Sequence, residues 1–246
     1  MSRKNWTDKK LFERLLHNKT QQTFWDNISE LRSRRNEFVY NTAYNLAQSS
    51  SEKEKIIGIY ILAQLGFAPR MHQQKTVNLY FELLKNEKSI KVLTALLSSI
   101  GHNNELLSNE RISQLVALKN HKYSTIRYFV VMSLLSVENT KAIDTLIELS
   151  EDKYSDIRNW ATFGIASQIE IDNQKIRKAL WDRINDSDEE TKIEAIIGLS
   201  ERKDPQIKKI IIQELNYAKN NTAFAEKWSE TLEEYLEKFD EKKKQP

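Results

Sequence analysis

A basic residue recurs at the same place in five successive segments of this chain of 246 residues. The segments share one design, as in IKVLTALLS and IRYFVVMSL. The spacings between the basic residues are 36, 36, 31 and 34 residues. A period in the thirties, combined with a helical spacing of apolar residues, is typical of stacked helix pairs. The five residues are Lys55, Lys91, Arg127, Arg158 and Lys192.

Apolar spacing and the breaks between segments predict helices along the whole chain. No useful stretch alternates with period two, and only five Gly and three Pro interrupt the pattern, so strands are not expected. The short connectors indicate antiparallel neighbours. The predicted helices are 7–18, 21–33, 36–48, 52–66, 72–86, 89–101, 109–120, 123–137, 140–150, 154–169, 173–185, 188–201, 206–218 and 224–239.

The organisation expected from this pattern has four parts. Residues 1–35 would form N-terminal capping helices, 36–216 the repeats, and 217–240 a C-terminal capping helix. Terminal repeats differ from the others because they have a neighbour on one side only. The charged residues 241–246 are expected to be a disordered tail.

The second helix of each pair is apolar nearly all round, which indicates that neighbouring helices enclose it. Two residues after the basic position stand Ile57, Leu93, Phe129, Trp160 and Glu194. Trp160 is therefore expected to pack in the core rather than to bind a partner. Glu194 breaks the apolar series, and we expect it either to be exposed or to pair with a cation.

An acidic residue stands six residues before the basic one in two repeats, Asp152 before Arg158 and Asp186 before Lys192. The pattern resembles HEAT repeats of the bacterial kind, called HEAT-like or PBS-lyase-type, over about residues 52–216. The resemblance implies an all-α, right-handed α–α superhelix, a solenoid of about five helix pairs with capping helices. It also implies that these four residues and Arg127 belong to a structural ladder of hydrogen bonds that links consecutive repeats, in which Asp152 pairs with Arg158 and Asp186 with Lys192, although His121 replaces the acid before Arg127.

The residues show no arrangement that would support catalysis or hold a cofactor. There is no cysteine, and none of the four histidines stands three or four residues from another, as a helical metal site requires. Glycine-rich phosphate loops and nucleophile elbows are absent too. No catalytic, metal or cofactor residue is predicted. The longest nearly apolar run, 56–68, is too short to cross a bilayer, so a cytoplasmic protein with no membrane partner is expected.

Charge is unevenly distributed and leaves a second function open. Residues 1–120 hold 18 Lys or Arg against 11 Asp or Glu, a net +7, whereas residues 121–246 hold 20 against 24, a net −4. A basic half can attract nucleic acid. HEAT-like DNA glycosylases and bilin lyases share the architecture, but neither family's functional residues can be mapped onto this chain.

The main functional prediction is a non-enzymatic scaffold or adaptor that binds another protein on the concave face of the solenoid. Nucleic-acid binding by the basic N-terminal half, with or without glycosylase activity, is the alternative, and no small-molecule substrate is evident. Lys55 and Lys91 have no acid six residues upstream, so we expect them to be free for an acidic partner. The candidate partner-binding residues are Lys55, Tyr60, Lys91, Tyr128 and Asn159.

Overall fold

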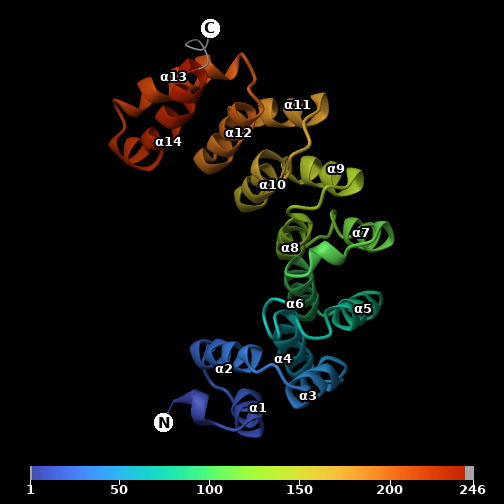
Figure 1. Ribbon diagram of the computed structural model, residues 1–246. Coiled ribbons are helices and arrows are strands. Elements are labelled where there is room, and N and C mark those ends of the chain that lie inside the picture. The colour runs from blue at the N-terminus through green and yellow to red at the C-terminus, as the bar shows by residue number, and fades with distance from the viewer. Residues whose placement is uncertain (1, 242–246) are drawn as a thin grey trace. The chain divides into compact units, whose positions relative to one another are not determined.

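The computed structural model describes residues 2–241, and within that range all the regular elements are helices. This confirms the prediction of an all-α chain. The helices fall into two compact units, the first ending at Ser133 and the second beginning at Leu134 (Figure 1). The predicted division into caps and repeats stays a prediction, and residues 242–246 of the expected tail lie outside the described residues.

The first unit begins with a short 3-10 helix and continues with paired α-helices. In the pair formed by α3 and α4 the two helices pack closely, and α4 and α6 lie side by side (Figure 1). Its elements are η1 Arg3–Asn5, α1 Asp8–Leu16, α2 Gln21–Ser33, α3 Glu37–Ala47, α4 Glu52–Ala63, α5 Gln73–Leu84, α6 Ile90–Gly101, η2 Asn104–Leu106, α7 Asn109–Val116 and α8 Ser124–Leu134, whose last residue falls beyond the boundary.

The second unit repeats the same design. α10 and α12 pack against each other, and α9 and α11 cover them on one side (Figure 1). The last two helices form an antiparallel pair in which α14 is the longest helix. Its elements are α9 Thr140–Leu149, α10 Ser155–Ser167, α11 Gln174–Arg183, α12 Glu189–Glu201, α13 Ile207–Ala218 and α14 Thr222–Glu241.

Short polar side chains fix where many of the helices begin. At the start of α4 the hydroxyl of Ser51 accepts a hydrogen bond from the backbone N–H of Glu54, and Asp188 does the same for Thr191 at the start of α12. Such N-caps satisfy backbone donors that have no partner inside the helix. The same arrangement is found at Thr7, Thr20, Asn36, Ser89, Ser108, Asn139 and Asn173.

Glycine allows α3 and α4 to touch along their backbones. A Cβ atom built on Gly58 would lie 2.3 Å from the backbone N of Ala47 and 2.4 Å from the carbonyl O of Ala43. Gly198 plays the same part between α12 and α10, where a Cβ would lie 2.6 Å from that of Ala166. Only a residue without a side chain permits these approaches.

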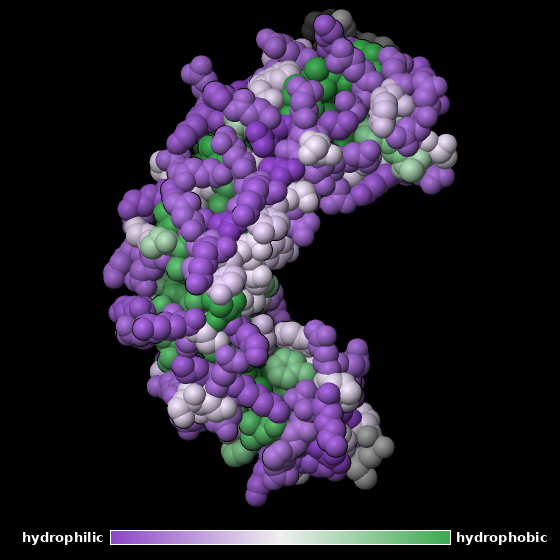
Figure 2. Space-filling view, turned by 180° about the vertical axis from the view of Figure 1, so that it is seen from behind, coloured by the Kyte–Doolittle hydropathy of each residue, from purple (hydrophilic) through white to green (hydrophobic). Residues whose placement is uncertain are grey.

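The cores are formed mainly by the second helices. In α4 the side chains of Ile57, Ile59 and Ile61 are all inaccessible to solvent. The surface on the face seen in Figure 2 is largely hydrophilic, and hydrophobic residues show through it in small patches. Each unit therefore has an apolar interior of its own beneath a mainly polar surface.

Candidate protein-binding surface

One side of α10 and α12 is only half covered. Trp160 and Phe163 of α10, and Ile197 of α12, are half-buried, whereas Ile57 at the position equivalent to Trp160 is inaccessible in α4. Trp160 and Phe163 contact edge to face, with ring centroids 5.6 Å apart. Trp160 was predicted to pack in the core, and it is only half-buried. We call this surface the α10–α12 face; it is formed by Asn159, Trp160, Phe163, Glu190, Glu194 and Ile197.

Glu194 is the least expected residue of this face. It is half-buried, and its carboxylate forms no hydrogen bond or ion pair with any residue in the described part of the chain. Burial, together with the nearby carboxylate of Glu190, raises the pKa of Glu194 to about 7. The prediction that Glu194 would be either exposed or paired is therefore wrong on both counts. An unpaired carboxylate in this position is ready to accept a cation or a hydrogen-bond donor.

Polar atoms of α10 and α14 also lack a partner. Asn159 donates through Nδ2 to Glu190 Oε2 at 3.1 Å, and Lys227 of α14 approaches Glu190 Oε1 at 2.5 Å. The amide oxygen Oδ1 of Asn159 is buried and accepts no hydrogen bond. The indole Nε1 of Trp228, on the same helix as Lys227, is buried and donates none. Buried polar atoms are nearly always paired, so such exceptions are worth explaining by a ligand or a partner.

The predicted partner-binding lysines of the first unit are both ion-paired. Lys55 Nζ lies 2.8 Å from Glu87, and Lys91 Nζ lies 3.2 Å from Glu52. The expectation that these lysines would be free is wrong because their acidic partners are not six residues upstream. Glu87 stands 32 residues after Lys55, ahead of the next second helix.

The other two candidates of the first unit lie among aromatic residues. Tyr60 contacts Trp25 of α2, with ring centroids 4.9 Å apart, and burial raises the pKa of its hydroxyl. Trp25 is 38% exposed, and the sequence contains no signal for it because the tryptophans share no common spacing. Tyr128 is half-buried on α8 and contacts Phe129 edge to face. Of the five candidates, only Asn159 lies on the α10–α12 face.

The ion pairs of the structural ladder in the second unit join one repeat to the next, whereas the contacts within a repeat are made to backbone carbonyls. Arg158 forms a bidentate pair with Asp186, at 2.9 Å from Nε and 2.8 Å from Nη2, and donates to Asp152 only at its backbone carbonyl. The predicted side-chain pair of Arg158 with Asp152 is therefore wrong, because the acid comes from the following repeat. Lys192 likewise pairs with Glu214 at 2.6 Å and not with Asp186.

Burial strengthens these ladder contacts. The side chain of Asp186 is 5% exposed. Burial alone would raise the pKa of Asp186, but the hydrogen bonds from Arg158 and from the backbone N–H of Asp188, together with the charges of Arg158 and Arg183, hold the pKa below its ordinary value. Arg127 is 8% exposed and donates to the carbonyl of His121 at 2.8 Å. These residues are held in structural contacts, and we do not assign them to a binding site.

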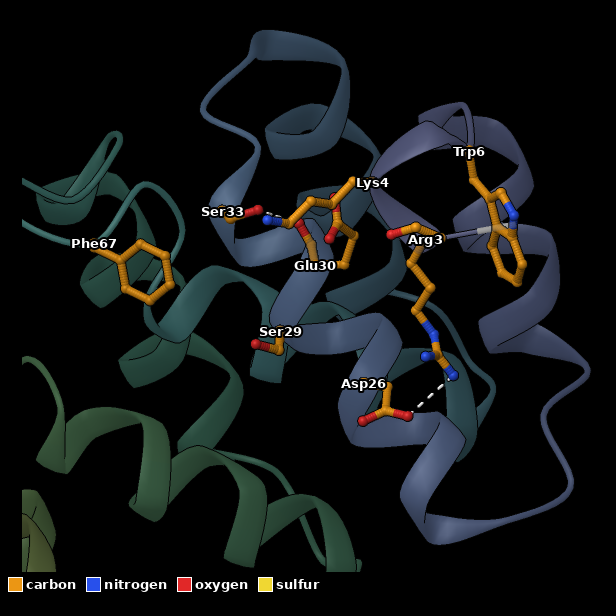
Figure 3. A pocket seen from close by; sticks show the side chains of 9 residues that line it. Arg3, Lys4, Trp6, Asp26, Ser29, Glu30, Ser33 and Phe67 are labelled. Atoms are coloured by element: carbon orange, nitrogen blue, oxygen red, sulfur yellow. Dashed lines mark hydrogen bonds and ion pairs between the residues drawn. The ribbon is translucent and has the colours of Figure 1, made fainter.

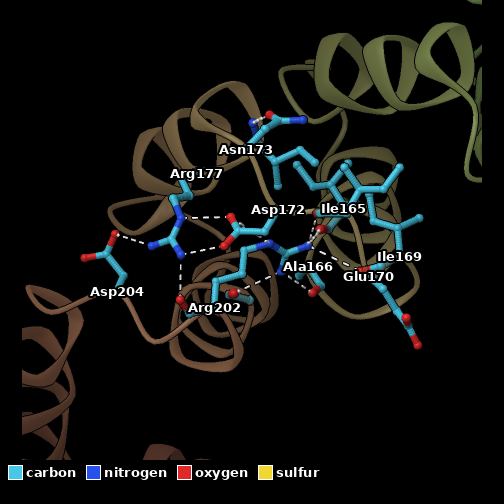
Figure 4. A network of polar contacts seen from close by, with 12 residues as sticks. Ile165, Ala166, Ile169, Glu170, Asp172, Asn173, Arg177, Arg202 and Asp204 are labelled. Atoms are coloured by element: carbon cyan, nitrogen blue, oxygen red, sulfur yellow. Dashed lines mark hydrogen bonds and ion pairs between the residues drawn. The ribbon is translucent and has the colours of Figure 1, made fainter.

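A second polar network holds the end of α10 (Figure 4). The guanidinium of Arg202 donates to the carbonyls of Ile165 and Ala166, at 2.8 and 2.7 Å, and burial lowers the pKa of Arg202. Next to it, Arg177 pairs with Asp172 at 2.6 Å. Arg202 thus satisfies carbonyls that the helix end leaves without a partner, which is a structural role.

Among the described residues, no group of three or more His, Asp or Glu side chains could hold a metal ion. Within the same residues, none of the helices is both long enough and apolar enough to cross a membrane.

Comparison with known proteins identifies the fold of this chain. No family model matches the chain. The sequence is similar to protein YibA of Escherichia coli K12, with 30% identity over 171 residues, which are 68% of this chain and 59% of YibA. The chain thus matches less than two thirds of that relative by sequence. The X-ray structure of YibA superimposes with a TM-score of 0.72 at 28% identity and covers 86% of this chain and 77% of YibA.

A structure of the archaeal HEAT-like repeats protein from Thermococcus onnurineus NA1 matches 94% of this chain and 98% of its own, with a TM-score of 0.53 and 14% identity. The chain has the HEAT-like repeat fold. A designed armadillo repeat protein in complex with a (KR)4 peptide matches 77% of this HEAT-like chain and 97% of its own, with a TM-score of 0.53 and 16% identity. The resemblance to HEAT-like repeats and the expected solenoid fold are confirmed.

Proposed function

We propose that this HEAT-like protein is a non-enzymatic scaffold that binds another protein on exposed faces of its second helices. The observation that carries the proposal is the α10–α12 face, where the half-buried rings of Trp160 and Phe163 are on the same helix as Asn159, whose Oδ1 has no partner among the described residues. Aromatic residues are enriched at protein interfaces because they bury a large apolar area. Helical-repeat proteins gain their function from such extended surfaces.

The chemistry of this face favours a basic partner segment. Glu194 has no cation beside it, and the neighbouring Glu190 is only partly neutralised by Lys227 at an exposed contact. A Lys or Arg side chain would pair with the Glu194 carboxylate and could lie against the ring of Trp160. The complex of a designed armadillo repeat protein with a (KR)4 peptide supports this choice of partner class.

The test compares wild type with two charge-reversal variants, Glu194→Lys on the face and Glu151→Lys in the exposed turn after α9. Tagged proteins would be incubated with nuclease-treated lysate, and bound proteins identified by mass spectrometry. We expect a specific partner that is retained by wild type and Glu151→Lys and lost by Glu194→Lys. Recovery of the same proteins by all three would contradict the assignment of the face.

A defined peptide tests the chemistry separately. Anisotropy of a fluorescent (KR)4 peptide should show binding to wild type that weakens by about tenfold or more in Glu194→Lys, since losing one charge-assisted contact costs roughly 1.5–3 kcal/mol. Glu151→Lys should change the affinity by less than about twofold, as expected for an exposed charge far from the contact. An equal loss of peptide affinity in both variants would show that the protein attracts the basic peptide non-specifically.

A further inference from the structure

Cavities adjoin one another around Trp6, at the amino end of the first unit. One of them, of about 710 Å³, lies between the N-terminal segment and α2 and is lined by acids as well as bases, with Arg3 held by Asp26 at 3.0 Å (Figure 3). The neighbouring cavity, of about 450 Å³, shares Arg3 and Trp6 with it but has no Asp or Glu in its lining. Its lining includes Arg3, Trp6, Arg14, His17, Lys19 and Asn27.

The basic side chains of the second cavity are not neutralised. Arg14, His17 and Lys19 form no ion pair with any described residue, and Arg14 lies over the Trp6 ring at 5.8 Å. Arg3 is compensated by Asp26, so the excess positive charge comes from the other side chains. Positive charge without counter-charge in a concave site attracts anions.

Two donors of the lining have no acceptor. Asn27 is 3% exposed, and its Oδ1 accepts from Arg3 Nε at 3.0 Å. Because the arginine can only donate, this contact fixes the amide orientation and leaves Nδ2 of Asn27 as a donor with no partner in the described chain. The indole Nε1 of Trp6 is buried and also unpaired. A ligand that satisfies both must supply acceptor atoms.

The wall of the cavity is held in place before any ligand arrives. Arg34, at the end of α2, donates to the carbonyl of Trp6 at 2.7 Å and to that of Arg3 at 3.0 Å. The same guanidinium pairs with Asp8 at 2.7 Å and Glu30 at 2.9 Å. The carboxylates fix the guanidinium, and the guanidinium fixes the backbone of the N-terminal segment. Binding to a site that is already ordered avoids the entropic cost of forming it.

We propose that this cavity binds a phosphate group, carried by a small molecule of the pyrophosphate class. Phosphate offers several strong acceptor oxygens and a charge that matches Arg14 and Lys19, and arginine suits it because its N–H groups are paired. The cavity volume falls in the range of sites for small ligands. This proposal is independent of the protein-binding function, because it concerns the first unit and not the α10–α12 face.

The test is titration calorimetry of the full chain with pyrophosphate at low salt. We expect saturable binding with a Kd below about 1 mM, weakened by about tenfold or more when both charges are removed in Arg14→Gln/Lys19→Gln. The matched control, Lys88→Ala/Lys209→Ala, removes the same net charge from exposed sites elsewhere and should change the Kd by less than about twofold. Trp6→Phe, which keeps a ring but loses the indole N–H, should also weaken binding.

A single-stranded oligonucleotide serves as a second ligand and identifies the source of the phosphate. If it binds more tightly than pyrophosphate and is weakened by the same two substitutions, the cavity binds phosphate of a nucleic-acid backbone, and the assignment to a small molecule is overturned. Oligonucleotide binding that Arg14→Gln/Lys19→Gln leaves intact, without pyrophosphate binding, would overturn the proposal. Absence of saturable pyrophosphate binding to wild type would overturn it as well. So would a loss of affinity in Lys88→Ala/Lys209→Ala equal to that in Arg14→Gln/Lys19→Gln.

Discussion

A half-buried carboxylate without a cation lowers the stability of the chain that contains it, and Glu194 is such a residue. Its pKa is raised to about 7 by burial and by Glu190, whereas an unfolded glutamate has its ordinary pKa of 4.5. Between these values the folded chain holds a proton that the unfolded chain has released. Stability is therefore lost as the pH rises from the unfolded pKa to the folded one, and the cost is complete above about pH 7.

Glu194→Gln should remove this pH dependence. We expect the variant to be more stable than wild type at pH 8 by about 1–2 kcal/mol, after allowance for partial exposure, and equal to it near pH 4. Urea unfolding at both pH values measures the difference. Because other groups also titrate, the comparison is between the two proteins at each pH. A difference that is the same at both pH values would contradict the raised pKa of Glu194.

At this scale the sequence identified the unusual residue but not its surroundings. Glu194 was recognised as a break in an apolar column, since the spacing of the repeats is visible in the chain. Whether it is exposed depends on what α14 and α10 cover, and those contacts join residues far apart in sequence. The unpaired atoms of Asn159 and Trp228 could not be predicted for the same reason.

The helices themselves were predicted closely from the sequence. The range predicted as 188–201 is observed at Glu189–Glu201, and the range predicted as 173–185 at Gln174–Arg183. The largest differences are at C-terminal ends, as where α4 stops at Ala63 although 66 was predicted. Leu65 continues the apolar pattern and is fully buried, but the chain turns at Gly66, which has φ +81°. The apolar spacing of a buried residue in the turn is the same as that of a further turn of helix, so the sequence alone does not show where α4 ends.

The contact between α3 and α4 gives a prediction for Gly58→Ala. In an isolated helix this change would stabilise by about 1 kcal/mol, because alanine is a better helix former. Here the new Cβ meets backbone atoms at 2.3 and 2.4 Å, and backbone cannot move aside as a flexible side chain would. We expect a net loss of about 2 kcal/mol or more, as overpacked cores show. Thermal unfolding followed by circular dichroism would measure it, and a raised melting temperature would contradict the close approach.

At the larger scale, ion pairs link neighbouring repeats within each unit, Lys55 with Glu87 in the first and Arg158 with Asp186 in the second. The ladder was predicted, but its partners were assigned one repeat too early, because Asp186 stands six residues before Lys192 and 28 after Arg158. Spacing alone does not distinguish these two pairings. The fold brings the acid toward the preceding basic residue, as it also does for Lys55 with Glu87.

Arg158→Ala should destabilise the second unit by roughly 1–3 kcal/mol, since the buried Asp186 then keeps only the longer contact with Arg183, at 3.4 Å, and the backbone N–H of Asp188. Lys175→Ala breaks the exposed pair with Asp144 and should cost less than about 1 kcal/mol. Hydrogen exchange by mass spectrometry would measure both. For Arg158→Ala we expect faster exchange in α10 to α12 and little change in α3 and α4, because stability in repeat proteins is coupled chiefly between neighbours. Faster exchange in all helices alike, or no change in exchange anywhere, would contradict this coupling between neighbouring repeats.

The hydrogen bonds from Arg34 to the backbone carbonyls of Arg3 and Trp6 have a practical consequence. A short segment ahead of the first α-helix of a folded unit is ordinarily easy to trim with a protease or to displace. Here those residues line a cavity, and they stay in place through one guanidinium anchored to Asp8 and Glu30. An affinity tag joined ahead of them would crowd this corner, so protein for ligand studies is better purified through the other end.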